Sequence, residues 1–276
     1  MHCAQGPRTS LDRVLRLLDS RTGSYAEVRP ARPGLLRVRV HAPGGSHITG
    51  LRVLLMADLL GRTAELRGLQ VLNVLTYTGR SSEQAAALER AAGELGVHPP
   101  AARADPDDAQ TPLGGPVDVH VVSSGTSVDG GQGGIVWHVG AVHARQEGNR
   151  AEAGAGDVPA RHGHDPLAVR LALMSFPSGQ AVDLTEGVLT GAREELGRWR
   201  HEVAEWAESP SRPMPARIAE VAHAAFDGLD TVSALALLRR LESDASVPPG
   251  AKFETFAYAD RILGVDLARD IGRARG

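Results

Sequence analysis

The chain has very little cysteine and lysine, since Cys3 and Lys252 are the only residues of their kinds among its 276 positions. A single cysteine excludes an internal disulfide, a zinc cluster built from thiolates and a paired redox motif, and it is typical of a reducing compartment. A single lysine leaves one candidate for any mechanism that needs an ammonium group.

Long apolar runs and a strong excess of one charge are also missing. Residues 1–21 alternate charged side chains with leucines, so we expect neither a signal peptide nor a membrane span, and a cytoplasmic protein. The 30 basic and 33 acidic residues give a formal net charge of −3, which argues against a broad nucleic-acid surface. With 42% hydrophobic residues, the chain can form a sizeable core.

The first half of the chain alternates strand-like and helix-like segments. Segments 50–67 and 81–96 have helical character, and Ser81 and Gln84 have the spacing of a capping box. This alternation predicts a parallel sheet with crossover helices. The strand-like runs, rich in branched residues, are 35–41, 69–77, 117–124 and 134–142.

Residues 144–164 are polar and rich in glycine and alanine, which predicts a loop and a domain boundary. After it the apolar residues recur with a helical period. We therefore predict an α/β domain over residues 1–164 and an all-α helical bundle over residues 165–276. The predicted helical segments are 165–175, 185–207, 215–229, 231–242 and 252–265.

Several segments, taken in order, resemble one family. They are LRLLDSRTG (15–23), SHITGLRVLLMADLL (46–60), LNVLTYTG (72–79), ELGVHPP (94–100), HDPLAVRLALMS (164–175) and AYADRILGVDL (257–267). Together they resemble cysteinyl-tRNA synthetases and the related cysteine ligase of mycothiol biosynthesis, which are class I synthetases. The resemblance implies a Rossmann-like nucleotide-binding domain followed by a helical domain.

The resemblance assigns SHITG to the family's signature turn, which packs ATP against the start of a helix, with Arg52 and Asp58 following at the family's positions. Thr49 stands where the family has a glycine that leaves room for adenine. Two readings stay open: a phosphate site at the helix start, or a polar cap in which the histidine lies at the surface. The nucleotide-binding candidates are Ser46, His47, Thr49 and Gly50.

Two further parts of the family's chemistry have weak counterparts. The lysine loop that holds ATP's phosphates would fall near residues 148–152, where Arg145 and Arg150 are the available cations. The family's zinc site would begin at His41, but no second cysteine follows, so we expect the zinc site to be lost. A site rebuilt from strand histidines is the alternative, and ordinary strand histidines are the favoured reading. The histidines concerned are His41, His120, His138 and His143.

Other patterns carry less chemistry. The glycine-rich stretch 123–134 could bind an anion, but it matches neither a Walker P-loop nor a dinucleotide fingerprint, so a connecting loop is the favoured reading. Trp199 and Trp206 have helical spacing and predict core anchors, or contacts with a partner helix.

The leading hypothesis is a degenerate synthetase paralogue that binds ATP, an adenylate-like metabolite or a protein partner and does not aminoacylate tRNA. The competing hypothesis is an active ligase that adenylates a cysteine-like amino acid and passes it to a small amine. A third is a purely structural partner subunit. The family's anticodon-binding part has no counterpart here, and with the acidic net charge this argues against a tRNA partner.

Overall fold

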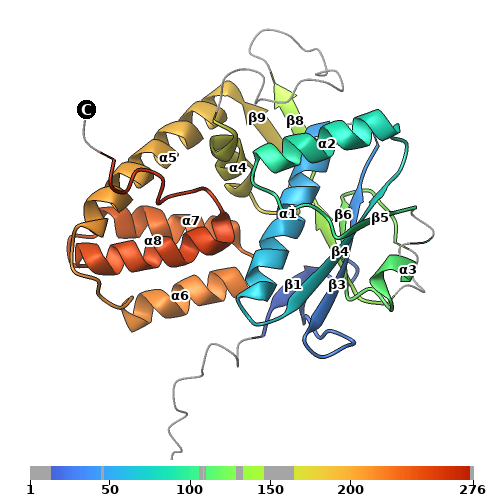
Figure 1. Ribbon diagram of the computed structural model, residues 1–276, viewed down its shortest axis with the longest axis horizontal. Coiled ribbons are helices and arrows are strands. Elements are labelled where there is room, and N and C mark those ends of the chain that lie inside the picture. The colour runs from blue at the N-terminus through green and yellow to red at the C-terminus, as the bar shows by residue number, and fades with distance from the viewer. Residues whose placement is uncertain are drawn as a thin grey trace, which may run out of the picture.

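A parallel sheet forms the first half of the protein, as predicted, but it has five strands, because the short strand Ala102–Ala104 lies outside the four predicted runs. The computed structural model describes residues 14–44, 47–105, 108, 110–128, 133–145 and 165–273. The strands lie in the order β5-β4-β3-β6-β7 (Figure 1). Their bounds are Leu35–Ala42 for β3, Gln70–Tyr77 for β4, Ala102–Ala104 for β5, Val119–Ser123 for β6 and Ile135–Val139 for β7.

Two crossover helices pack on one face of this sheet, which confirms the predicted alternation. Helix α1 (His47–Glu65) follows β3, and α2 (Ser82–Glu94) follows β4. The predicted capping box is present, because Ser81 and Gln84 satisfy each other's backbone amides. Helix α1 is buried on nearly all sides, since it packs on the sheet and also contacts α2 and α8. A short helix, α3 (Gln110–Leu113), lies between β5 and β6.

The sequence reading missed two small sheets. Strands β1 (Arg16–Asp19) and β2 (Ser24–Glu27) form a hairpin whose Ser20 amide donates to the Val136 carbonyl at 2.7 Å. The hairpin thus covers the edge of β7, which would otherwise offer unpaired backbone groups. Strands β8 (Val142–Arg145) and β9 (Val182–Thr185) pair in parallel.

The prediction of one strand over 134–142 was wrong because the chain breaks at Gly140. A Cβ on this residue would lie 2.0 Å from the Gln180 carbonyl oxygen. Only glycine allows this close backbone approach, which turns the chain from β7 into β8.

The second half is helical, as predicted, apart from β9. It comprises α4 (Pro166–Met174), α5 (Glu186–Ala207), α6 (Ala216–Asp227), α7 (Thr231–Ser243) and α8 (Pro249–Leu263). Trp199 and Trp206 both pack edge-on against Phe256, with ring centroids 5.6 and 5.0 Å apart, which confirms them as core anchors. No helix in the described part is long and apolar enough to cross a membrane.

One hydrophobic cluster runs through both halves, from Leu36 in β3 through Leu55 in α1 to Leu263 in α8. The sheet and the helices therefore share a core, and α1 lies between them (Figure 1). The division into two domains at residue 164 stays a prediction.

Candidate functional site

The predicted signature turn lies where the strand order of the sheet reverses. Strands β4 and β5 follow β3 on one side, and β6 and β7 lie on the other. In open α/β sheets, ligands bind at the carboxyl ends of the strands at such a reversal. Helix α1 begins here at His47, five residues after the end of β3. Gly45 and the candidate Ser46 lie outside the described residues.

Thr49 does not point into open space. It is buried, and its hydroxyl accepts a hydrogen bond from the Val142 amide at 3.0 Å. This contact fixes the first turn of α1 to β8. The candidate threonine therefore has a structural partner on the side of the turn that faces β8.

Gly50 allows another chain segment to approach the helix on a different side. A Cβ on Gly50 would lie 3.2 Å from a terminal nitrogen of Arg80 and 3.1 Å from a methyl group of Leu88. The missing side chain thus leaves room for an arginine beside the first turn of α1.

Arg80 is the site residue that the sequence reading missed. Its Nε donates to the Pro43 carbonyl at 2.8 Å, which holds the guanidinium across the loop between β3 and α1. Burial lowers the pKa of this guanidinium, and the nearby Tyr77 opposes that shift. The only available signal was its position three residues after the end of β4, at the same sheet edge as His47.

The local electrostatics favour an anion. The first turn of α1 carries no acidic side chain, and the amides at a helix start have a positive potential. Arg80 adds a cation there, and His47 adds an imidazole. A phosphate or carboxylate would offset this concentration of positive potential.

Arg52 has a structural role in this protein. Its guanidinium is fully buried and donates to four backbone carbonyls, and burial lowers its pKa to about 10. It joins α1 to the turns before β8 and β9. The acceptors are Gly140 at 3.1 Å, Phe176 at 3.3 Å, Pro177 at 2.8 Å and Gln180 at 2.6 Å.

Asp58 is also structural. Its buried carboxylate accepts from Arg170 at 2.6 Å and from Arg62 at 2.8 Å. It also accepts from the His98 amide at 3.0 Å. Burial alone would raise its pKa, but the two arginines and the amide hold the pKa below its ordinary value.

His41, at the position of the family's first zinc ligand, is engaged on both ring nitrogens. Nδ1 lies 2.8 Å from the Thr76 hydroxyl and Nε2 lies 3.0 Å from the Thr78 hydroxyl. Burial lowers the pKa of this ring, and a metal could bind either nitrogen only if the threonine on that nitrogen moved away. Among the described residues, no group of three or more His, Cys, Asp or Glu is arranged to hold a metal ion.

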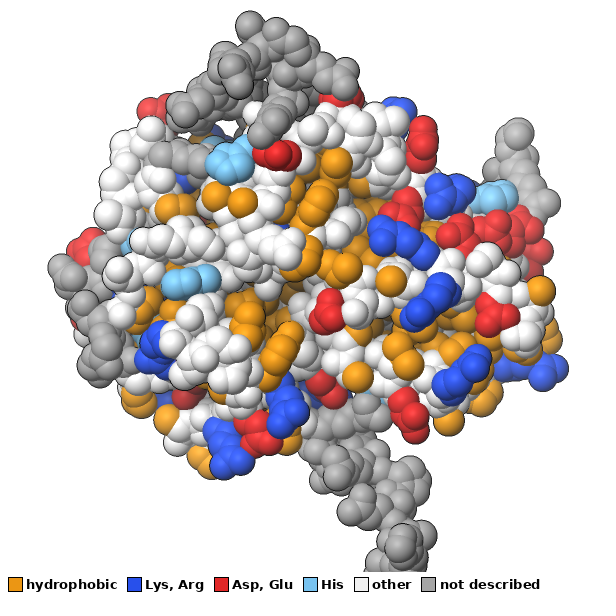
Figure 2. Space-filling view, turned by 180° about the vertical axis from the view of Figure 1, so that it is seen from behind, with side chains coloured by type: hydrophobic (Ala, Val, Ile, Leu, Met, Phe, Trp, Pro, Cys, Tyr) orange, Lys and Arg blue, Asp and Glu red, His pale blue; other side chains and the backbone are white. Residues whose placement is uncertain are grey.

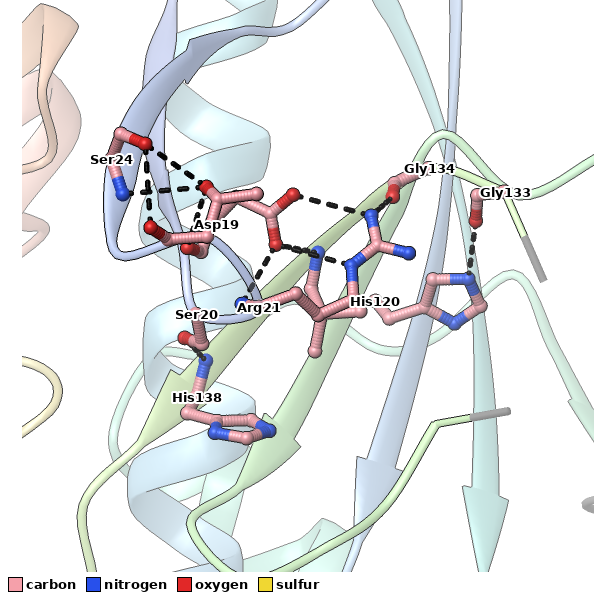
Figure 3. Close-up of polar contacts among 10 residues, drawn as sticks. Asp19, Ser20, Arg21, Ser24, His120, Gly133, Gly134 and His138 are labelled. Atoms are coloured by element: carbon pink, nitrogen blue, oxygen red, sulfur yellow. Dashed lines mark hydrogen bonds and ion pairs between the residues drawn. The ribbon is translucent and has the colours of Figure 1, made fainter. Parts of the chain in front are cut away.

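His120 and His138 lie beside the β7 region and the hairpin that covers it (Figure 3), while His143 is exposed on β8. His120 is fully buried with Nε2 3.0 Å from the Gly133 carbonyl oxygen, and burial lowers its pKa. The His138 amide donates to the Ser20 hydroxyl at 2.9 Å, and Arg21 forms an ion pair with Asp19. These contacts agree with ordinary strand histidines.

The two predicted phosphate contacts stay untested by the geometry. Arg145 is the last residue of β8, and its side chain lies outside the described part, as do Arg150 and Cys3. The glycine-rich stretch after β6 begins with a hydrogen bond of 3.0 Å between the hydroxyls of Ser123 and Thr126.

Comparisons with known proteins support the resemblance. No family model matches the chain. It is 34% identical over 121 residues to the Kytococcus sedentarius L-cysteine:1D-myo-inositol 2-amino-2-deoxy-alpha-D-glucopyranoside ligase, covering 38% of this chain and 28% of that protein. It is 38% identical over 111 residues to the ligase of the same name from Streptomyces griseus subsp. griseus, covering 39% and 26%. The Thermobifida fusca ligase of that name is 35% identical over 112 residues, with the same coverage.

The matched stretches thus span about a quarter of these relatives. A solved Campylobacter jejuni structure, described as an arginyl-tRNA synthetase, covers 87% of this chain and 90% of its own, with 9% identity and a TM-score of 0.46. Over the matched stretch, the relatives support kinship with the class I synthetase-like cysteine ligases.

Proposed function

We propose that this chain is a synthetase-like protein that binds ATP or an adenylate-like ligand through its phosphates at the start of α1, without aminoacylating tRNA. The observation that supports binding is the position of the Arg80 guanidinium beside Gly50, in the first turn of a 19-residue helix that begins at His47 and has no acid there. The N-terminal end of a helix that carries such donors is suited to binding phosphate oxygens.

Three contacts support the loss of catalysis. The Thr49 hydroxyl bridges to Val142 on the side where the resemblance expects adenine, so the base would have to lie elsewhere. Lys252 donates to the Glu242 carbonyl at the end of α7, where it also lies over the Trp206 ring. The nitrogens of His41 are both held by threonines. Neither the family's lysine chemistry nor its zinc-dependent selection of cysteine is therefore expected.

An active ligase is the alternative, and the names of the relatives favour it. Such an enzyme would adenylate a cysteine-like amino acid and transfer it to a small amine, with His47 and Arg145 or Arg150 on the phosphates. Loss of the two lysines of the family's phosphate-binding loop would remove several kcal/mol of transition-state stabilisation. Loss of one preorganised donor alone costs about 3 kcal/mol. This loss is the reason we favour a binding protein.

A protein partner is a better expectation than tRNA. On the face seen in Figure 2, acidic and basic side chains are interspersed over the helical half. A mixed surface suits protein contacts better than a polyanion, which needs a continuous basic stripe. The cytoplasmic location expected from the sequence is part of the same proposal.

Thermal denaturation with ATP, AMP and a non-hydrolysable cysteinyl-adenylate analogue tests the proposed nucleotide binding. We expect a rise in melting temperature, since a ligand at a hundredfold excess over its Kd stabilises by about 2.7 kcal/mol. His47→Ala and Arg80→Gln should abolish most of the rise. Arg240→Gln, on the exposed end of α7, is the matched control and should leave the rise unchanged.

Exchange between ATP and pyrophosphate, measured with each amino acid in turn, tests the proposed loss of catalysis. We expect no exchange. Exchange with any amino acid would contradict the degenerate reading and establish the ligase alternative. If neither exchange nor a ligand-dependent rise in melting temperature occurs, the start of α1 has no role in nucleotide binding. The structural-subunit hypothesis then replaces both the binding-protein and the ligase hypotheses.

A further inference from the structure

A buried imidazole lies between two hydroxyl groups at the carboxyl ends of β3 and β4. Nδ1 of His41 lies 2.8 Å from the Thr76 hydroxyl, and Nε2 lies 3.0 Å from the Thr78 hydroxyl. Thr76 is fully buried, whereas Thr78 is exposed. The contacts therefore run from the interior of the sheet to a hydroxyl that solvent and ligands can reach.

The hydrogen-bond partners of these groups favour one tautomer of the ring. The Thr76 hydroxyl donates to the Val40 carbonyl at 3.4 Å. Its oxygen then accepts the Nδ1 proton of His41, and the unprotonated Nε2 accepts the proton of Thr78. This tautomer makes three hydrogen bonds. The other tautomer makes two, because Thr76 must then donate to Nδ1 and no longer donates to Val40.

The three side chains have the roles of an activated nucleophile. A hydroxyl becomes nucleophilic when a base within hydrogen-bond distance takes its proton and a third group orients that base. Thr78 supplies the hydroxyl, Nε2 of His41 is the base and Thr76 is the positioning residue. Burial, with Arg39 nearby, lowers the pKa of His41, and a lower pKa favours the neutral ring that can accept a proton.

The turn that carries Thr78 packs against the loop before α1. A Cβ on Gly44 would lie 2.6 Å from the Thr78 carbonyl oxygen, so the two segments are in close backbone contact. Arg80, two residues later, donates to the Pro43 carbonyl and reaches the first turn of α1. The hydroxyl, a cation and the start of the helix thus border one loop. A ligand held by its phosphate at the helix start needs to extend only across this loop to meet the hydroxyl.

We propose that Thr78 is a nucleophile that accepts the acyl group of a mixed anhydride between a carboxylic and a phosphoric acid, with His41 as its general base. Acyl phosphates and acyl adenylates belong to this class. The choice of substrate class rests on the proposed function, in which a phosphate binds at the start of α1.

The reaction has two steps. In the first, the Thr78 oxygen attacks the carbonyl carbon while its proton passes to Nε2 of His41. The new ester bond replaces the bond from that carbon to the bridging oxygen, and phosphate or AMP leaves with the electron pair. The imidazolium then gives its proton to solvent.

In the second step, a water molecule attacks the ester of Thr78. His41 takes a proton from this water and gives it to the departing threonine oxygen. The sum is hydrolysis of the anhydride to a carboxylic acid and a phosphate. The reaction consumes an anhydride and does not form one, so it needs no exchange between ATP and pyrophosphate.

Hydrolysis of acetyl phosphate and acetyl adenylate by the full chain tests the nucleophile. We expect release of phosphate or AMP and, after an acid quench, an acetyl group on the peptide that contains Thr78. Thr78→Val keeps the shape of the side chain and should lose both signals, while Thr78→Ser should keep them. Thr22→Val, at an exposed threonine of the hairpin turn, is the matched control and should behave as the wild type does.

The base and the positioning residue have separate readouts. His41→Gln should slow the release of AMP by at least about a hundredfold, the usual contribution of a general base. In nitrogen-15 NMR, the neutral His41 ring should carry its proton on Nδ1. Thr76→Val removes the acceptor of that proton and should move it to Nε2. Melting temperatures of all variants report whether they are folded.

The proposal is overturned if the wild type hydrolyses neither probe, or if folded Thr78→Val hydrolyses both as fast as the wild type. It is also overturned if the neutral His41 ring of the wild type carries its proton on Nε2, since the hydroxyl then has no base. Failure of the proposed function gives a different result: AMP leaves the melting temperature unchanged, while acetyl phosphate still acetylates Thr78.

Discussion

Arg170 is fully buried, and this single side chain connects three elements. It donates to Asp58 of α1 at 2.6 Å, to the Leu95 carbonyl after α2 at 3.1 Å and to the Leu263 carbonyl at the end of α8 at 2.5 Å. The sequence identified Asp58 as a signature residue but gave no sign of this partner, which is 112 positions away. At the scale of the residue, the inherited aspartate stabilises the junction between the sheet and the helices.

Removing this guanidinium leaves a buried carboxylate with one fewer cation. We predict that Arg170→Ala lowers the free energy of unfolding by about 3–5 kcal/mol, as for other broken buried ion pairs. Urea denaturation at neutral pH measures it. Arg273→Ala breaks an exposed pair with Asp270 and should change stability by less than about 1 kcal/mol. Equal effects of the two substitutions would contradict the structural role given to Asp58.

At the scale of the element, helix starts show how local signals and distant contacts combine. Asp165 is the N-cap of α4, where its side chain accepts from the Leu167 amide, and Pro166 follows it. These are sequence signals that place a helix start correctly. The same carboxylate also pairs with Arg200 of α5 at 2.7 Å, which local sequence does not indicate.

The two roles of Asp165 can be separated by pH. Burial alone would raise its pKa, but hydrogen bonds from Arg200 and the Leu167 amide hold it below the ordinary value. A carboxyl whose folded pKa is depressed contributes stability above its unfolded pKa of about 3.9, and that contribution is lost as pH falls through the folded pKa. The contribution should therefore be present at pH 7 and disappear in acid.

We predict that Asp165→Asn, which keeps a cap acceptor but loses the charge, is less stable than the wild type by about 0.5–1 kcal/mol at neutral pH. This difference should shrink as pH falls from about 5 to about 3. Asp165→Ala also loses the cap and should cost about 1 kcal/mol more. Urea unfolding across this pH range measures both, and a difference that does not change with pH would exclude an ion-pair contribution.

At the scale of the whole molecule, α1 packs against both the sheet and the helical half. Its side chains belong to a cluster that extends from Leu36 of the sheet to Leu263 of α8. Units that share a core unfold together when neither can bury its apolar face alone. The protein is therefore expected to behave as one cooperative unit.

We predict a single calorimetric transition, with calorimetric and van't Hoff enthalpies in agreement. Leu36→Ala in β3 should cost about 2–5 kcal/mol and lower the midpoint seen by far-UV dichroism and by tryptophan fluorescence to the same extent. Trp137 lies in β7 of the sheet, so the fluorescence is measured in a Trp137→Phe background, where Trp199 and Trp206 report from the helical half alone. Two separate transitions would instead support independent domains divided near residue 164.

The sequence by itself determined the main strands β3, β4 and β6, the crossover helices and the helices of the second half, because hydrophobic period, caps and turn residues act over a few neighbouring positions. It also located the turn at His47 and the register of Arg52 and Asp58. Only the tertiary structure decided what these residues do. Arg80 comes beside Gly50 because β4 pairs with β3, and Thr49 meets Val142 because β7 ends against the start of α1. Such contacts join residues that are 30 to 93 positions apart, and chain folding rather than local preference sets their distance.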